Sequence, residues 1–415
     1  MASPKILPSD RLTIVVVNDY GHVNGGAGQV AFASARELAR RGHDVRLFCA
    51  VPPVEPTLEA DGVRVVCTGQ PDILLNPNRL QAAYQGIWNR PAAAAMADLL
   101  RPLDPRRTVV HLHGWTKALS SSIVPEILRH GAGLLATLHD YFLACPNGGF
   151  FNYVAERSCT LSPLSTACLL SNCDPRGRAQ KLWRTTRHYV QSHQGQLPNG
   201  VRHFIAISDF SYNIIAPYLP DNASIYRISN PIESERVSCA DVGRNTRYVV
   251  VGRLTREKGP FLAAEAARRA GVELEFVGDG YLRQEITTRY PEHGVTGWLP
   301  HEKLVRRLEG SRALVFPSLW YETFGLVVLE AAACGVPAIV PDASAVRDSV
   351  VQGETGLCFR SGDVEDLVRK IRQFQDPELA SRLGRAAYER FWSSPPTPAA
   401  HVDQLEQCYR KVLQA

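Results

Sequence analysis

Short apolar runs alternate with amphipathic stretches along almost the whole chain. In the N-terminal half the strand-like runs lie near residues 12–18, 45–50, 63–67, 108–112, 134–138, 202–207 and 224–228. In the C-terminal half they lie near residues 248–251, 273–277, 313–316 and 337–340. Because strands that alternate with helices form parallel sheets covered on both faces, this pattern predicts an α/β protein.

Two breaks divide the pattern. Ser229-Asn230-Pro231 is a turn-forming linker, so we expect an N-terminal domain over 1–230 and a second domain over 231–392. The first domain contains an insertion at about 140–200 that has no clear strand. The proline-rich stretch 393–398 precedes a last helix near 401–413, and we expect residues 393–415 to pack back on the N-terminal domain.

Composition excludes several classes of protein. No apolar run approaches the ~18 residues of a membrane helix. The first residues, with Pro4 and Pro8, lack the apolar region of a secretory signal, so we expect a cytoplasmic protein. The net charge of +5 arises from 46 basic and 41 acidic residues, a balance that does not indicate a nucleic acid partner.

The second half carries residues suited to an anionic ligand. Arg253 and Lys258 follow a strand, at the edge where open α/β sheets bind ligands, and their charges suit a phosphate or pyrophosphate. A helix expected to begin near Gly325 would offer free backbone amides to the same anion. Glu322 precedes this helix and Glu330 lies on its second turn, so the two carboxylates can bind different parts of one extended ligand.

The ordered set of these motifs resembles the retaining, nucleotide-sugar-dependent glycosyltransferases of the GT-B fold, family 4. The matching residues are Gly252-Arg253-Leu254, Lys258-Gly259, Val277-Gly278-Asp279-Gly280, Pro317-Ser318, Glu322, Glu330 and Cys334-Gly335-Val336-Pro337. The His139-Asp140-Tyr141 element, followed by CPNGGFFNY, resembles the bacterial exopolysaccharide and lipopolysaccharide transferases of that family. The resemblance is close over 248–360 and looser before. It implies two Rossmann-like domains that face a central cleft.

The resemblance also implies roles for individual residues. Arg253 and Lys258 would stabilise the departing diphosphate, Glu322 would bind hydroxyls of the donor sugar, and Glu330 would bind the ribose. Phe324, Gly325 and Leu326 would contribute backbone contacts to the donor, as would Gly278 and Gly280. The chain contains no Asp-x-Asp pair, which favours a metal-independent reaction.

A glycine-rich segment follows the first strand, and residues 26–31 satisfy the G-x-G-x-x-A pattern of dinucleotide-binding proteins. Six residues separate the strand from these glycines, and the next strand ends without the acid that binds ribose. A dehydrogenase therefore remains a distant alternative. By the resemblance, Gly25 and Gly26 would face the donor phosphates and the acceptor.

Histidines end two further strands of the first half. His113 follows the run 108–112 and matches the active-site histidine of the family, whereas His111 is expected to be structural. His139 and Asp140 follow the run 134–138 and are candidates for the acceptor side. A histidine at such a position can relay a proton or bind a sugar hydroxyl.

The insertion contains Cys145, Cys159, Cys168 and Cys173 without a C-x-x-C pair. Buried reduced thiols are the first interpretation, and a structural zinc site is the alternative. The following segment alternates basic residues with Leu182, Trp183 and Tyr189. It is expected either to lie on an anionic membrane, peripheral on the inner face, or to pack with its charges in solvent.

Together these features predict a retaining hexosyltransferase that uses a nucleoside diphosphate sugar, a UDP- or GDP-sugar first, and requires no cofactor. The acceptor would be a glycan or lipid-linked saccharide in cell-surface polysaccharide synthesis. The alternatives are a nucleotide-sugar epimerase or hydrolase of the same fold, and a non-catalytic partner that binds nucleotide or glycan.

Overall fold

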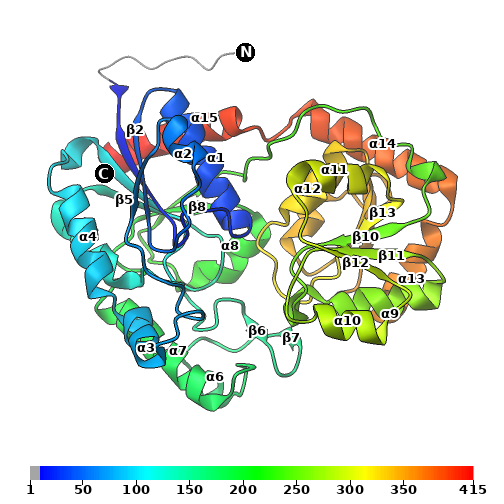
Figure 1. The fold of residues 1–415 in the computed structure, drawn as a ribbon, viewed down its shortest axis with the longest axis horizontal. Helices are drawn as coiled ribbons and strands as arrows, with labels where there is room; N and C mark the ends of the chain where they lie inside the picture. The colour runs from blue at the N-terminus through cyan, green and yellow to red at the C-terminus, as the bar shows by residue number, and fades with distance from the viewer. Residues whose placement is uncertain (1–9, 415) are drawn as a thin grey trace. The chain divides into compact units, whose positions relative to one another are not determined.

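The computed structural model describes residues 10–414, and the N-terminal motif with Pro4 and Pro8 lies outside them. The chain forms two compact units (Figure 1). The first contains the chain through Gly149, Leu161–Glu233 and the segment from Pro396 on, and the second contains Phe150–Thr160 and Ser234–Pro395. Residues 150–160 therefore belong to a different unit from the rest of the predicted insertion.

The first unit is built on a seven-stranded sheet in the order β3-β2-β1-β4-β5-β8-β9, and all neighbouring strands are parallel. Its strands are β1 (Thr13–Val17), β2 (Asp44–Cys49), β3 (Arg64–Cys67), β4 (Thr108–Leu112), β5 (Gly133–Thr137), β8 (His203–Ala206) and β9 (Ser224–Arg227). Its α-helices are α1 (Gly26–Arg40), α2 (Thr57–Ala60), α3 (Arg79–Ile87), α4 (Arg90–Leu100), α5 (Val124–His130), α6 (Thr166–Leu170), α7 (Arg178–His193), α8 (Asp209–Ile215) and α15 (Pro398–Gln414). The central strands β1, β4 and β5 are buried, as their unbroken Val, Ile and Leu runs predict.

The second unit has a six-stranded parallel sheet in the order β12-β11-β10-β13-β14-β15. Its strands are β10 (Tyr248–Val251), β11 (Leu274–Val277), β12 (Gly294–Gly297), β13 (Ala313–Val315), β14 (Ala338–Pro341) and β15 (Gly356–Phe359). Its α-helices are α9 (Pro260–Ala270), α10 (Arg283–Arg289), α11 (His301–Glu309), α12 (Leu326–Ala333), α13 (Val364–Gln373) and α14 (Pro377–Ser393). The antiparallel hairpin of β6 (Phe151–Asn152) and β7 (Arg157–Ser158) belongs to this unit.

The predicted α/β class is confirmed in both units. In each sheet the strand order reverses beside the first strand, between β1 and β4 in the first unit and between β10 and β13 in the second. Ligands of open α/β sheets bind outside the carboxyl ends of the strands at this switch point. The fold therefore marks one candidate binding edge in each unit.

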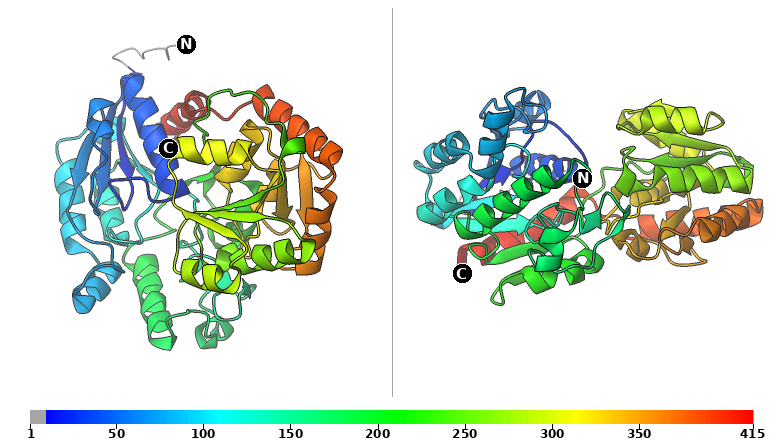
Figure 2. Two further views of the ribbon diagram at one scale, coloured as in Figure 1. Left: turned by 45° about the vertical axis from the view of Figure 1, so that its right-hand side comes forward. Right: turned by 90° about the horizontal axis from the view of Figure 1, so that it is seen from below.

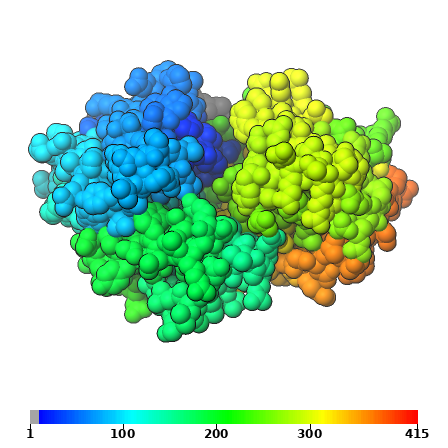
Figure 3. All heavy atoms as spheres, turned by 60° about the horizontal axis from the view of Figure 1, so that its bottom comes forward, coloured from blue at the N-terminus to red at the C-terminus, as the bar shows by residue number. Residues whose placement is uncertain are grey.

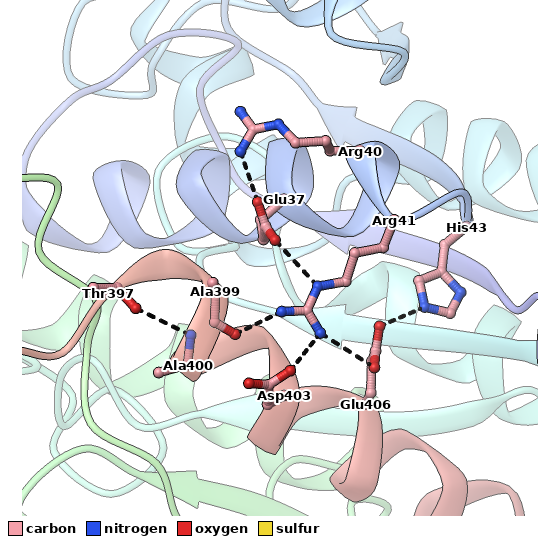
Figure 4. A network of polar contacts seen from close by, with 9 residues as sticks. All are labelled: Glu37, Arg40, Arg41, His43, Thr397, Ala399, Ala400, Asp403 and Glu406. Atoms are coloured by element: carbon pink, nitrogen blue, oxygen red, sulfur yellow. Dashed lines mark hydrogen bonds and ion pairs between the residues drawn. The ribbon is translucent and has the colours of Figure 1, made fainter. Parts of the chain in front are cut away.

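The last helix packs on the first unit, where α15 contacts α1, β4 and β5 (Figure 2). Ion pairs and a hydrogen bond from the buried Arg41 side chain connect it to this unit (Figure 4). The guanidinium of Arg41 lies 3.1 Å from Glu37 and 2.6 Å from Asp403, and it donates to the carbonyl of Ala399 at 2.7 Å. Arg41 and Glu37 are buried, whereas Asp403 is 62% exposed, so the network joins a buried cation of the first unit to the surface of α15. Pro398 is the first residue of α15, a position where proline costs no hydrogen bond, and the helix begins three residues before the predicted start.

Candidate active site

The switch point of the second unit carries a pocket at the carboxyl ends of β10 and β13. Its lining comes from three short segments, which are Val250–Leu254, the Lys258 and Pro260 positions, and Phe316–Ser318. Arg253 and Lys258, both predicted from sequence, lie at this pocket. The Arg253 side chain is exposed, so its guanidinium is available to a ligand.

Lys258 and Glu322 meet at this edge of the sheet. The Lys258 ammonium Nζ donates to Glu322 Oε2 at 2.5 Å. The same carboxylate oxygen accepts a hydrogen bond from the Trp320 indole at 2.9 Å and one from the Ser318 hydroxyl at 3.3 Å. Sixty-four residues separate the two charged groups in sequence, so the fold alone brings them together.

Glu322 remains ionised although it is buried. Burial alone would raise the pKa of its carboxyl, but Lys258, the Trp320 hydrogen bond and Arg253 together lower the pKa below its usual value. A fixed carboxylate therefore lies against the Lys258 ammonium that lines the pocket, and close to the Arg253 guanidinium. A ligand with phosphate oxygens and hydroxyl groups can satisfy both signs of charge.

Backbone contacts hold the Lys258 loop in this position. The amide of Leu319 donates to the carbonyl of Glu257 at 2.9 Å, which ties the loop after β10 to the loop after β13. Gly259 has a φ of 64°, and a Cβ atom there would lie 2.2 Å from the carbonyl oxygen of Pro317. Only glycine fits this approach, so the Lys258-Gly259 pair of the sequence has a direct structural reason.

Gly278 and Gly280 also allow two backbone segments to approach closely. A Cβ atom at Gly278 would lie 2.0 Å from the carbonyl oxygen of Gly252, and one at Gly280 would lie 2.4 Å from that of Leu254. The amide of Leu254 donates to the carbonyl of Asp279 at 2.9 Å. These glycines bring the loop after β11 against the Arg253 loop, and their predicted contact with the donor stays a prediction.

The helix α12 begins at the same edge. Gly325 is its N-cap with a φ of 83°, and a Cβ atom there would lie 2.1 Å from Val346 Cγ1. The first amides of a helix lack intrahelical partners and are suited to an anion. Phe324 and Leu326, which flank Gly325, are partly exposed, and Glu330 is buried on the second turn of the helix.

The first unit presents a pair of histidines at its own switch point. His113 follows β4 and His139 follows β5, and His113 Nδ1 lies 2.9 Å from His139 Nε2. Burial lowers the pKa of both imidazoles, that of His139 to about 3 and that of His113 well below 6.5. The pair is therefore neutral, and one ring donates its proton to the other. His113 Nε2 is buried without a hydrogen-bond partner among the described residues.

Charged groups surround Asp140 beside this pair. Burial raises the pKa of Asp140 to about 6, against the opposite influence of Lys117 and Arg187. The Asp140 carboxylate accepts a hydrogen bond from the amide of Phe142 at 2.9 Å. The Arg187 guanidinium lies 5.1 Å from the centre of the Phe142 ring and donates to the carbonyl of Thr116 at 3.1 Å. The predicted acceptor-side residues thus belong to a larger polar cluster.

Asp19 is an important residue that the sequence did not single out. It is buried at the end of β1, and its two carboxylate oxygens accept hydrogen bonds from the amides of Lys117, Ala118 and Leu119 at 2.8–2.9 Å. Asp19 therefore fixes the loop that follows His113. Its position directly after the first strand was the available signal.

Other predictions for the first unit have different outcomes. Gly25 is the N-cap of α1 with a φ of 95°, and both Gly25 and Gly26 are exposed. His111 is structural, with its ring between the hydroxyls of Tyr409 and Thr137 at 2.9 and 2.7 Å. The role of Gly25 and Gly26 in donor binding stays a prediction.

The alternative of a four-cysteine zinc site is not supported. Within residues 10–414 no group of three or more His, Cys, Asp or Glu side chains is arranged to hold a metal ion. Cys159 belongs to the second unit, whereas Cys145, Cys168 and Cys173 belong to the first. The Lys181 ammonium lies 3.1 Å from Cys173 Sγ and 3.7 Å from Cys168 Sγ, so a cation stands where a metal would have to lie.

Of the two alternatives for the basic helix α7, packing through Leu182 with the charges in solvent is wrong, and the membrane alternative stays a prediction. Lys181 and Arg187 are buried, whereas Leu182 and Tyr189 are exposed. The reason is that the buried cations find partners inside, since Arg187 donates to carbonyls and stacks on Phe142 and Lys181 contacts sulfur atoms. No helix within residues 10–414 is long and apolar enough to cross a membrane.

Two family models match the chain. "Glycosyltransferase Family 4" matches residues 24–236 and "Glycosyl transferases group 1" matches residues 233–390. A glycogen synthase of Mycobacterium tuberculosis is 33% identical over 92% of this chain and 91% of its own length. A GDP-mannose-dependent alpha-mannosyltransferase of Mycolicibacterium smegmatis is 40% identical over 32% of this chain and 38% of its own length.

Solved structures share the fold. A sucrose-phosphate synthase of Thermosynechococcus elongatus matches with a TM-score of 0.70 and 19% identity, and covers 97% of this chain and 100% of its own. HepE of Anabaena, solved with UDP and glucose, matches with a TM-score of 0.66 and 16% identity, and covers 96% and 99%. Both likenesses confirm the predicted GT-B fold.

Proposed function

Since the chain belongs to glycosyltransferase family 4 and is a nucleotide-sugar-dependent enzyme, we propose that it transfers a hexosyl unit from a UDP- or GDP-sugar to a hydroxyl acceptor. The anomeric configuration is retained. The acceptor is a glycan or a lipid-linked saccharide in cell-surface polysaccharide synthesis. The observation that carries the proposal is the Lys258–Glu322 pair, held beside Arg253 at the switch point of the second unit.

The charges of this site suit the departure of a nucleoside diphosphate. When the glycosyl–phosphate bond breaks, negative charge develops on the phosphate oxygens. Lys258 and Arg253 bind that charge, and the amides at the start of α12 add the positive end of a helix dipole. These groups are fixed before the reaction, so little reorganisation is needed.

The carboxylates position the donor. Glu322 accepts from Lys258 through one oxygen, Oε2, and binds hydroxyls of the transferred sugar. Glu330 binds the ribose. In the first unit, His113 in its neutral form contacts the sugar through Nε2, and His139 holds the ring by hydrogen bonding to Nδ1. The mechanism requires no metal ion.

A panel of UDP-, GDP- and ADP-sugars tests the proposal. We expect one donor to be consumed only when a saccharide acceptor is present, with the anomeric configuration of the product read by NMR. Consumption without an acceptor would instead indicate an epimerase or hydrolase of the same fold. Nucleotide binding without turnover for any donor and acceptor would indicate a non-catalytic partner.

A further inference from the structure

Large apolar side chains are gathered on one surface of the first unit. Among the described residues, nine large apolar side chains are more than half exposed, and six of them lie on or beside α3, α6 and α7. These six form what we term the apolar patch, which comprises Leu75, Leu80, Tyr84, Leu170, Leu182 and Tyr189. Leu80 is 85% exposed and Leu170 is 77% exposed. A concentration of this kind marks an interaction site in a folded protein.

Packing brings the three helices that carry the patch next to one another. The Trp183 indole of α7 donates to the carbonyl of Ala83 in α3 at 3.0 Å. Gly86 lets the helices approach, because a Cβ atom there would lie 2.6 Å from the Trp183 ring. Cys168 of α6 lies 3.7 Å from Lys181 of α7. Figure 1 shows α3, α6 and α7 close together, and Figure 3 shows the blue surface around α3 bordering the green surface of α6 and α7.

The period of α7 separates its two faces. Leu182 and Tyr189 are seven residues apart and lie on one exposed face of the helix. Lys181, Arg187 and Gln191 lie on the buried face. Hydrogen bonds from Arg187 and Gln191 hold the buried face against the loops after β4 and β5, so Leu182 stays on the solvent side of the helix.

The charge around the patch has a single sign. The helices α3, α6 and α7 contain no aspartate or glutamate. The nearest acids in sequence, Asp72 and Asp174, are both buried, and Asp174 is paired with Arg184 at 2.9 Å. Arg79 and Arg178 are exposed beside the leucines. The surface is therefore apolar and cationic together.

We propose that the apolar patch docks the first unit on a membrane surface rich in anionic lipid. The leucines enter the boundary between headgroups and acyl chains, and Arg79 and Arg178 bind the anionic headgroups. Tyr84 and Tyr189 suit the interface because their rings are apolar and their hydroxyls remain hydrated. A second copy of the chain is a poorer occupant, since two such patches would oppose arginine to arginine without an acid between them. The docking does not rest on the proposed transfer reaction.

Vesicle co-sedimentation of the full chain tests the proposal. The vesicles are phosphatidylcholine with about one-third phosphatidylglycerol, compared with phosphatidylcholine alone. We expect binding to the anionic vesicles at low salt, weakened by high salt, and little binding to the neutral ones. The double variant Leu80→Glu, Leu182→Glu should bind at least about tenfold more weakly, because two leucines that would enter the membrane are lost and two charges that anionic lipid repels are gained.

Val154→Glu is the matched control. Val154 is an exposed apolar residue of the second unit, outside the patch, so the same charge change there should leave vesicle binding unchanged. Circular dichroism and nucleotide binding of each variant show whether its fold is intact. Equal vesicle binding by the wild type and the double variant would overturn the proposal. A dimer in sedimentation that the double variant dissociates, without vesicle binding, would assign the patch to a second copy instead.

Discussion

The two units carry differently charged residues at the switch points of their similar parallel sheets. At the switch point of the second unit, a charged Lys258–Glu322 pair lies beside Arg253. At the switch point of the first unit, His113 and His139 share one hydrogen bond and are neutral. Strand order therefore sets the edge of the sheet at which a ligand binds. The residues that follow the strands set which chemical group of the ligand is bound there.

The difference in charge between the two sites follows from the hydrogen-bond partners of each buried side chain. Glu322 accepts hydrogen bonds from three donors, so its charge survives burial. The imidazoles of His113 and His139 are buried against one another, and His113 also packs on His111. Among residues 10–414 no carboxylate bonds to a ring nitrogen of His113, so burial removes the charge of the pair. The charged site suits a diphosphate, and the neutral site suits hydroxyl groups.

The largest effect is expected from removing the cation of the second unit. Lys258→Met should lower kcat/KM by about a thousandfold, the loss seen when a single charge-stabilising donor is removed from a transition state. The variant also leaves Glu322 without its ammonium. Arg256→Met is the control, because Arg256 lies on the same loop but pairs with Glu156. A similar loss in both variants would place the effect in the loop and not in the Lys258 charge.

Removing the neutral ring of the first unit should have a smaller effect. His113→Ala should lower kcat by about a hundredfold, within the range of a single positioned proton-transfer or hydrogen-bonding group. Because the pKa of His113 lies well below 6.5, wild-type turnover should show no acid limb near pH 6.5. If wild-type turnover does fall below pH 6.5 and this fall is absent in His113→Ala, the His113 imidazole is protonated in that range. That result would contradict the neutral state of the first unit's site.

A milder change sharpens the account of Glu322. Trp320→Phe removes the hydrogen bond from the indole to Glu322 Oε2 while the ring beside Lys258 remains. A hydrogen bond to a charged group contributes about 1.5–3 kcal/mol, so we expect kcat/KM to fall by roughly 10- to 150-fold. Steady-state kinetics with the donor varied measure it. Unchanged kinetics would show that Lys258 alone holds the carboxylate.

The smallest effect concerns stability against pH. Burial lowers the pKa of His401 to about 4, so below pH 6.5 the unfolded chain binds a proton there that the folded chain does not. The stabilisation by His401 is present above pH 6.5 and declines as pH falls toward 4, by at most about 1.4 kcal/mol per pH unit. Urea unfolding of the wild type and His401→Gln should give free energies that converge over this range.

Measuring the wild type beside His401→Gln separates the contribution of His401 to the free energy of unfolding from that of the buried carboxyl groups in the first unit. The pKa values of Asp140 and Asp19 are raised, so their contribution to the free energy of unfolding has the opposite sign and is common to both proteins. A difference between wild type and His401→Gln that stays constant from pH 7.5 to 4 would contradict the neutral state of this histidine.

Much of the fold was predictable because buried parallel strands leave unbroken apolar runs. All seven strands of the large sheet lie where such runs predict them. β12 and β15 were missed, since Gly294–Gly297 and Gly356–Phe359 are short and begin with glycine, which carries no strand signal. The sequence pattern predicts the start of α15 too late, because proline resists a helix interior, whereas Pro398 occupies the first position of the helix.

The candidate site was predictable only in part. Lys258 and Glu322 could be named because charged residues after apolar runs point to the binding edge of a sheet. Trp320 could not, because the apolar pattern does not show that its indole donates to Glu322 two residues away. Asp19 offered only its position after the first strand, since its amide partners come from a loop about 99 residues later. The sequence also does not show that Lys181 is buried and Leu182 exposed. It shows the period of a helix but not which of its faces the rest of the protein covers.

Thermal unfolding with nucleoside diphosphates tests most directly the central claim, that the cationic pocket of the second unit binds the diphosphate of the donor. A ligand that binds only the folded state raises Tm. We expect at least one of UDP, GDP and ADP to raise the Tm of the wild type more than its monophosphate does, and Lys258→Met to lose most of that increase. An equal increase in both proteins, or none with any diphosphate, would contradict the account.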